Sequence, residues 1–103
     1  MALEPNWEEV ETTKYGKQFL DKSSLFNNSD GTIEISSKYQ TFEGKNKKIK
    51  NEYIYLMKID CDNKLFKDIK INNEMQKNNH WQKSNGDLLI DKLIQKSCSI
   101  NIS

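Results

Sequence analysis

Two cysteines, Cys61 and Cys98, are the residues of this 103-residue chain whose type and spacing could most directly do chemistry. A nucleophilic cysteine reacts as its thiolate, and Cys61 lies between Asp60 and Asp62, whose negative charges disfavour that form. The chain contains no Cys-x-x-Cys motif, and His80 is its only histidine. We therefore interpret both cysteines as structural rather than catalytic.

His80 beside Trp81 is the other candidate for a catalytic site. No serine or cysteine with an orienting carboxylate accompanies the histidine, so a surface histidine next to a partly buried tryptophan is the preferred interpretation. One histidine and two cysteines do not supply the three or four ligands of a zinc site. The segment 29–31 has the composition of a calcium loop, but Phe26 and Ser37 occupy the positions that require carboxylates. We expect no catalytic residue, no metal site, no cofactor and no enzymatic activity.

A dense run of lysines is the main candidate for binding. The run could contact an acidic partner such as a sulfated glycan, an anionic lipid or an acidic protein surface. The alternative is a solvated loop, because Glu43 and Glu52 flank the run. Trp81 is a further candidate if its ring is exposed. The lysines concerned are Lys45, Lys47, Lys48 and Lys50.

The basic residues of the whole chain argue against one class of partner. All 16 of them are lysines, and the formal net charge is only +1. Proteins that read DNA or RNA specifically make frequent use of the bidentate guanidinium of arginine, whose geometry lysine cannot imitate. We therefore expect no nucleic-acid partner. The length predicts one domain with one core over residues 1–103.

The elements that must position these residues follow from the spacing of apolar side chains. Alternation with period 2 predicts strands at 33–40 and 53–61, and a shorter one at 65–71 after the tight turn 62–64. Less regular patterns predict an extended segment at 7–10, a turn at 14–17 and a short strand at 19–21. Residues 43–50 are expected to form a polar connection. Two strands joined by so short a turn as 62–64 must run antiparallel.

The C-terminal segment changes to helical spacing. An N-cap and an acidic first turn in 84–87 precede the apolar positions Leu89, Ile90, Leu93 and Ile94, which predict a helix over 87–98. The fold class is therefore α+β: a single antiparallel β-sheet with a C-terminal α-helix packed on one face.

The strand and the helix place the two cysteines within reach of each other. If the helix packs on the Met57 and Ile59 face, both sulfurs lie in one layer, and a disulfide would close a loop of about 38 residues. Two buried free thiols in a cytosolic protein are the alternative. Ile54 and Leu56 make the opposite sheet face apolar as well, which predicts a partner surface or a homodimer there. Coverage by the N-terminal strands of the same chain is the alternative.

The chain resembles the surface-adhesin protein E family of Gram-negative bacteria over roughly residues 7–98. The resemblance rests on the order and spacing of a set of short motifs. It departs from the family pattern in having lysine where relatives often have arginine after Asp60-Cys61, and in lacking a lipobox cysteine. The motifs are Trp7 with Val10, Phe19-Leu20-Asp21 with Ser24-Leu25, Tyr55 to Cys61 with Lys64 and Phe66, and Trp81 before the helix that ends in Cys98.

This resemblance implies an exported domain with a disulfide between the two matching cysteines, located in the periplasm or on the outer-membrane surface. It implies a non-catalytic, adhesin-like protein that binds an extracellular or envelope protein, such as a host matrix protein. Any lipid anchor would lie in a segment that this chain does not contain. The alternative function is a periplasmic inhibitor of a host or rival enzyme, comparable to a lysozyme inhibitor.

Overall fold

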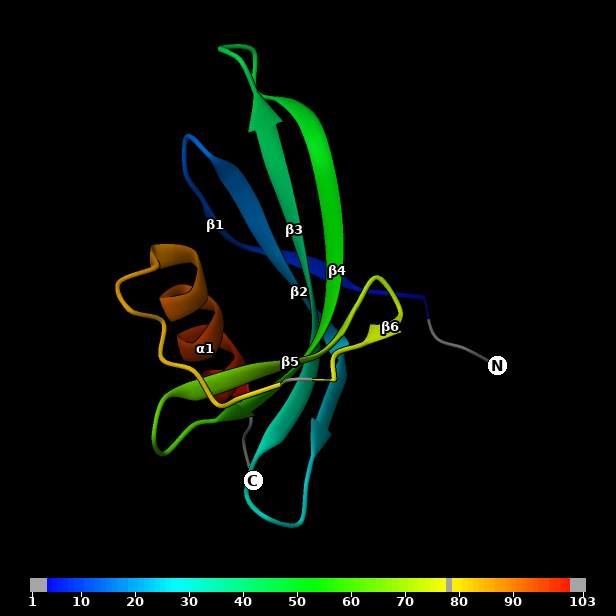
Figure 1. The fold of residues 1–103 in the computed structure, drawn as a ribbon, viewed down its shortest axis with the longest axis vertical. Helices are drawn as coiled ribbons and strands as arrows, with labels where there is room; N and C mark the ends of the chain where they lie inside the picture. The colour runs from blue at the N-terminus through cyan, green and yellow to red at the C-terminus, as the bar shows by residue number, and fades with distance from the viewer. Residues whose placement is uncertain (1–3, 78, 101–103) are drawn as a thin grey trace.

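In a computed structural model, which describes residues 4–77 and 79–100, the chain folds into one antiparallel sheet and one helix (Figure 1). Each strand pairs with the next one in sequence, so the order across the sheet is β1-β2-β3-β4-β5-β6. The strands are β1 (Trp7–Thr12), β2 (Gly16–Asn27), β3 (Ile33–Glu43), β4 (Lys48–Asp60), β5 (Leu65–Ile71) and β6 (Glu74–Met75), and the helix is α1 (Leu88–Ile100).

The core lies on one face of the central strands, where side chains alternate between buried and accessible positions. Ile33 of β3 is paired with Ile59 of β4, and Ile35 is paired with Met57. These four side chains are fully or almost fully buried, and Leu20 of β2 joins them. The period-2 alternation predicted from the sequence is therefore confirmed, because opposite residues of paired strands share one face of the sheet.

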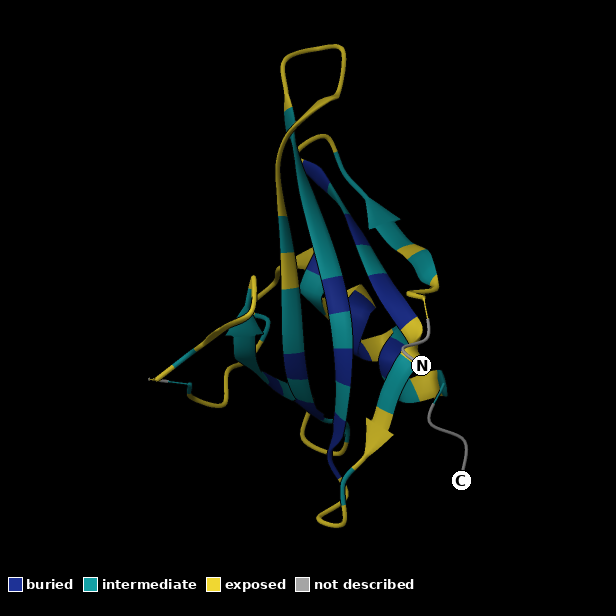
Figure 2. Cartoon of the chain, turned by 90° about the vertical axis from the view of Figure 1, so that its right-hand side faces the viewer, coloured by how far each residue is buried: buried dark blue, intermediate teal, exposed yellow. Residues whose placement is uncertain are grey.

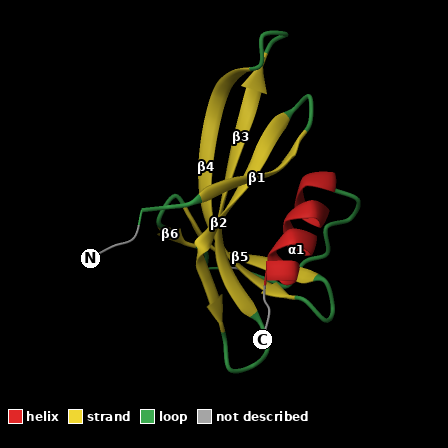
Figure 3. Ribbon diagram, turned by 180° about the vertical axis from the view of Figure 1, so that it is seen from behind, coloured by secondary structure: helices red, strands yellow, loops and turns green. Residues whose placement is uncertain are grey.

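The helix α1 covers this core face (Figure 3). Its buried apolar residues are Leu89, Leu93 and Ile94, and the last two join the same hydrophobic cluster as the strands. Figure 2 shows the buried positions concentrated where α1 and the sheet meet. The α+β fold class is confirmed, and the helix spans 88–100 rather than 87–98. The described part of the chain holds no helix of the length and apolar character needed to cross a bilayer.

The helix begins where the sequence predicts a cap. The carboxylate oxygen Oδ1 of Asp87 accepts hydrogen bonds from the backbone N–H groups of Leu89, at 3.0 Å, and Ile90, at 3.3 Å. These N–H groups have no carbonyl partner within the helix, so the side chain satisfies them.

Replacing Asp87 by alanine is expected to lower the free energy of unfolding by about 1 kcal/mol, because both cap hydrogen bonds are lost. Asp87→Asn retains a side-chain oxygen and should recover most of that loss. Urea unfolding followed by circular dichroism measures both variants. Equal destabilisation by alanine and asparagine would contradict the capping role.

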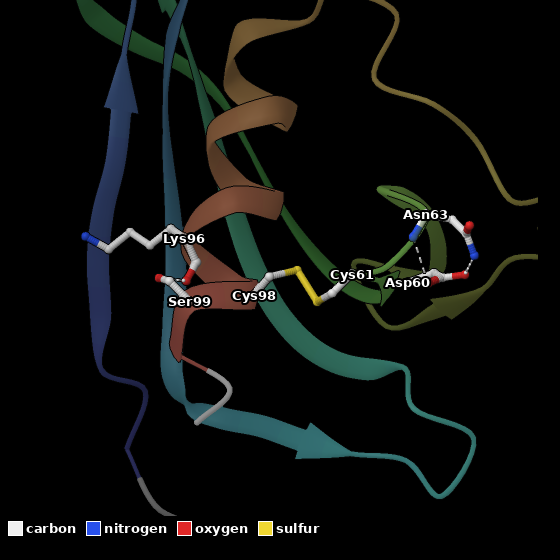
Figure 4. Close-up of a disulfide and its surroundings, with 6 residues drawn as sticks. All are labelled: Asp60, Cys61, Asn63, Lys96, Cys98 and Ser99. Atoms are coloured by element: carbon white, nitrogen blue, oxygen red, sulfur yellow. Dashed lines mark hydrogen bonds between the residues drawn. A yellow bond between two sulfur atoms is a disulfide. The ribbon is translucent and has the colours of Figure 1, made fainter. Parts of the chain in front are cut away.

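A disulfide joins Cys61, directly after β4, to Cys98 in the last turns of α1 (Figure 4). The alternative of two free thiols is therefore wrong for this structure. The turn after Cys61 is held by Asp60, whose carboxylate accepts hydrogen bonds from the backbone N–H and the side-chain amide of Asn63. The disulfide thus fastens the C-terminal end of α1 to the β4–β5 turn.

Strands β2 and β4 extend beyond the sequence-based expectation. Strand β2 extends over 16–27 instead of 19–21, and the 43–50 connection shortens because β4 already begins at Lys48. Both extensions arise from backbone pairing with β3. The first and last residues of β2, Gly16 and Asn27, are paired with Thr41 and Ile33 of β3. On the other side of β3, the first residue of β4, Lys48, is paired with Glu43. Pairing with a neighbouring strand satisfies backbone groups whether or not the side chains alternate.

Candidate functional site

The sheet face opposite α1, which we call the outer face, carries side chains from five strands. In Figure 2 this face is turned to the viewer, and no helix or strand of the described chain lies over it. The expected alternative, coverage by the N-terminal strands, is wrong, because β1 pairs in the plane of the sheet at its edge. The strand register places both basic and acidic side chains on this face, and the acidic ones are Glu9, Asp21, Glu34 and Glu52. The residues that concern a binding site are Trp7, Phe19, Ser36, Lys38, Ile54, Leu56, Lys67 and Lys70.

Lysines and aromatic rings are interleaved on the outer face. The ammonium group of Lys38 lies 4.7 Å from the ring centre of Trp7 and 4.9 Å from that of Phe19. On β5, the ammonium of Lys67 lies 4.6 Å from the ring centre of Trp81. Stacking on an aromatic face holds a lysine head group near the sheet without neutralising its charge.

A shallow hollow of about 380 Å³ lies on the outer face between β3, β4 and the turn after β5. Ile54 and Leu56 give it an apolar lining, and Ile54 is 43% exposed. Asn72 also lines the hollow, and its side-chain oxygen accepts a hydrogen bond of 2.9 Å from the backbone N–H of Ile54. Ser36 and Lys70 add polar groups to the lining. Protein interfaces combine apolar and polar groups, and the lining of this hollow offers both.

The charges of the outer face are only partly compensated. Lys17 forms an ion pair of 3.3 Å with Glu9. Hydrogen bonds from Thr12 and Lys17 lower the pKa of the Glu9 carboxyl below its usual range. In contrast, Lys38, Lys67 and Lys70 form no ion pair with any described residue. These three lysines are therefore available to an acidic partner.

The predicted binding residues occupy two separate places. All four lysines of the run are exposed, and they lie at the free end of the β3–β4 hairpin, which projects at the top of Figure 1. Lys45 and Lys47 are in the turn, whereas Lys48 and Lys50 belong to β4. Trp81 is 39% exposed and lies in the segment between β6 and α1, next to Gln82, which pairs with Phe66 of β5. The structure therefore does not bring Trp81 and the lysine run together.

Sequence reasoning missed Trp7, Phe19, Lys38 and Lys70 as members of a common surface. The period-2 alternation of 33–40 puts Lys38 on the face opposite Ile33 and Ile35, but it does not align this strand with those that carry Phe19 and Trp7. One sequence signal for this surface is present, because each of the first two strands carries an aromatic residue. Only the register of β1 with β2 and of β2 with β3 shows that these rings meet one lysine.

Among residues 4–77 and 79–100, no three His, Cys, Asp or Glu side chains are grouped so that they could hold a metal ion. His80 is exposed, as expected for a surface histidine.

Comparison with known proteins decides the family. The model of the surface adhesin-E family matches residues 8–103, which is nearly the whole chain. The chain belongs to the surface adhesin-E family. This confirms the family suggested by the sequence motifs, and it makes the chain an adhesin-like, exported or surface protein. No curated protein and no solved structure gives a significant match. For this surface adhesin-E protein, the exposed outer face is therefore the first place to look for a binding site.

Proposed function

We propose that this protein is a non-catalytic binding protein of the cell envelope, which holds an extracellular or envelope protein through its outer face. The observation that carries the proposal is the uncovered sheet face itself, with its hollow lined in part by Ile54 and Leu56, its aromatic rings, and three lysines that form no ion pair with a described residue. Exposed apolar area of this kind, surrounded by polar groups, typically marks an interaction site.

The charge of the outer face determines the class of partner. Lys38, Lys67 and Lys70 present ammonium groups beside apolar surface, so the complementary surface carries carboxylates around an apolar centre. An acidic protein of the host matrix fits this description. The lysine run at the tip of the β3–β4 hairpin extends the same charge beyond the hollow. Export to the periplasm or the outer-membrane surface, with or without a lipid anchor, is part of this proposal.

The proposal is tested with two matched double substitutions. Lys38→Glu with Lys70→Glu reverses two charges on the outer face, and Lys83→Glu with Lys92→Glu reverses two exposed charges near or on α1. Both variants have the same net charge. Surface plasmon resonance against a panel of purified acidic extracellular-matrix proteins measures the affinities. We expect the outer-face variant to bind its partner at least about tenfold more weakly, and the control to bind like the unmodified protein.

The outcomes separate the alternatives. Equal losses in both variants would indicate a non-specific charge effect and overturn the proposal, as would a complete lack of binding to the panel. A dimer in sedimentation experiments that the outer-face substitutions disrupt would assign the face to a second copy instead. Inhibition of a lysozyme by the unmodified protein, abolished by substitutions in the lysine run, would favour the inhibitor alternative, which the family match does not support.

A further inference from the structure

A cavity of about 660 Å³ lies between the start of α1 and the core face of the sheet, on the side opposite to the outer face. Its volume falls within the range of roughly 300–1,000 Å³ that is typical of sites for small organic ligands. Aromatic and aliphatic side chains form most of its walls. These are Tyr15, Tyr39, Tyr55, Met57, Phe66, Leu88, Leu89 and Ile90.

The charges in this cavity are of one sign. Asp68 of β5 and Asp87 line it, and none of the described lining residues is basic. Asp87 already caps α1. Asp68 has neither a hydrogen bond nor an ion pair with any described residue, and burial raises the pKa of its carboxyl above the usual value. A partly buried carboxylate without a partner gains from a cationic ligand, because the new ion pair offsets its lost hydration.

A second polar group lines the cavity from β2, with β3 and β4 between it and Asp68 on β5. Gln18 is 3% exposed and lies on the face of β2 that is turned to the core, opposite Tyr39 of β3. The amide of Gln18 can donate and accept hydrogen bonds, so it offers a polar contact to a ligand in the cavity. Tyr39 and Tyr55 lie between these two polar residues, on β3 and β4.

We propose that this cavity binds an organic amine, with its ammonium group at Asp68, its aromatic or aliphatic body against Tyr39 and Tyr55, and a hydrogen-bonding group at Gln18. Tyrosine rings attract cations through their negative faces, which adds to the attraction of the carboxylate. The ammonium group can belong to a free small molecule or to a lysine side chain of a peptide. This site is independent of the proposed macromolecular partner, because it lies on the other face of the sheet.

The probes are chosen to isolate each feature of the ligand. Tyramine carries an ammonium group, an aromatic body and a hydroxyl group. 4-Ethylphenol lacks the ammonium group, and 3-(4-hydroxyphenyl)propionate replaces it by a carboxylate. The peptide acetyl-Ala-Lys-Ala-amide represents the other source of the amine. Each probe is titrated into the ¹⁵N-labelled protein, and the shifts of backbone amides in β4, β5 and the first turn of α1 are followed by NMR.

Two matched variants test the role of the carboxylate. Asp68→Asn keeps the shape of the side chain and removes its charge, and Asp62→Asn makes the same change in the exposed turn after β4. We expect Asp68→Asn to weaken amine binding at least about tenfold, because a charge-assisted hydrogen bond is lost, and Asp62→Asn to leave it unchanged. Asp68→Asn should unfold at the same or a higher urea concentration, which excludes misfolding as the cause.

The outcomes distinguish the two sources and the competing explanation. Binding of tyramine supports a small-molecule site, whereas binding of the lysyl peptide alone supports recognition of a peptide side chain. Equal affinity for tyramine and 4-ethylphenol, or tyramine binding unaffected by Asp68→Asn, would overturn the proposal. Absence of binding by both amines would overturn it as well. The Lys38→Glu with Lys70→Glu variant should bind tyramine normally, so a failure here is distinguishable from a failure of the proposed function.

Discussion

Replacing Cys61 and Cys98 together by alanine is expected to lower the free energy of unfolding by about 4 kcal/mol. The two residues are 37 positions apart in the sequence, so the disulfide removes the loop-closure entropy of more than a third of the chain from the unfolded state. The total stability of a domain of this size is only about 5–15 kcal/mol. The loss is therefore expected to shift the unfolding transition strongly.

Urea unfolding followed by tryptophan fluorescence measures this effect. The oxidised protein, the same protein in excess reductant and the double alanine variant are compared, and the last two should unfold at closely similar urea concentrations. This agreement is the control for lost packing, because the reduced protein keeps both sulfur atoms. If the reduced and oxidised proteins unfolded together, the disulfide would not contribute to stability, and α1 would be held by packing alone.

Replacing Leu93 by alanine is expected to cost about 3 kcal/mol of stability. Leu93 is fully buried at the centre of the face that α1 presents to the sheet, within the cluster that contains Leu20, Ile35 and Met57. Its truncation removes apolar contacts and leaves a cavity that the rigid sheet can fill only in part.

Leu88→Ala provides the matched control for Leu93→Ala. Both residues lie in α1, so the change in helix propensity is comparable, but Leu88 is 49% exposed and should lose less than about 1 kcal/mol. Thermal unfolding and urea unfolding of both variants give the two free energies. Similar losses for the two leucines would contradict the packing of α1 on the core face.

The most regular parts of this fold could be predicted from local sequence patterns. The strands around Ile35 and Met57 and the helix around Leu93 show clear periods, because each has one face in the core and one in water. The ends of β2 and β4 could not be predicted in this way. Phe26 of β2 and Ile49 of β4 are exposed, although both belong to strands that pair with β3. Backbone pairing does not require an alternation of apolar and polar residues, so these strand ends show no periodic pattern in the sequence.

The candidate site was less predictable than the fold. The lysine run was visible because its members are close together in sequence, and the structure places it at a hairpin tip. The arrangement of Lys38 between Trp7 and Phe19 combines three strands, and its formation depends on their register. The same holds for the cavity, where Gln18 and Asp68 are separated by two strands. Contacts across strands carry no signal at any fixed sequence spacing.

The sequence by itself determined the fold class, the family and the structural role of the cysteines. The periodicity of apolar residues indicates which side of each strand or helix faces the core. The order of the short motifs matches that of the surface adhesin-E family and indicates the order of the strands and the helix. The tertiary structure alone decided that β1 pairs at the edge and leaves the outer face open, and that Asp68 and Gln18 line one cavity. The physical reason is that strand register and helix docking are set by the packing of the whole core, whereas local patterns record only the burial of single residues.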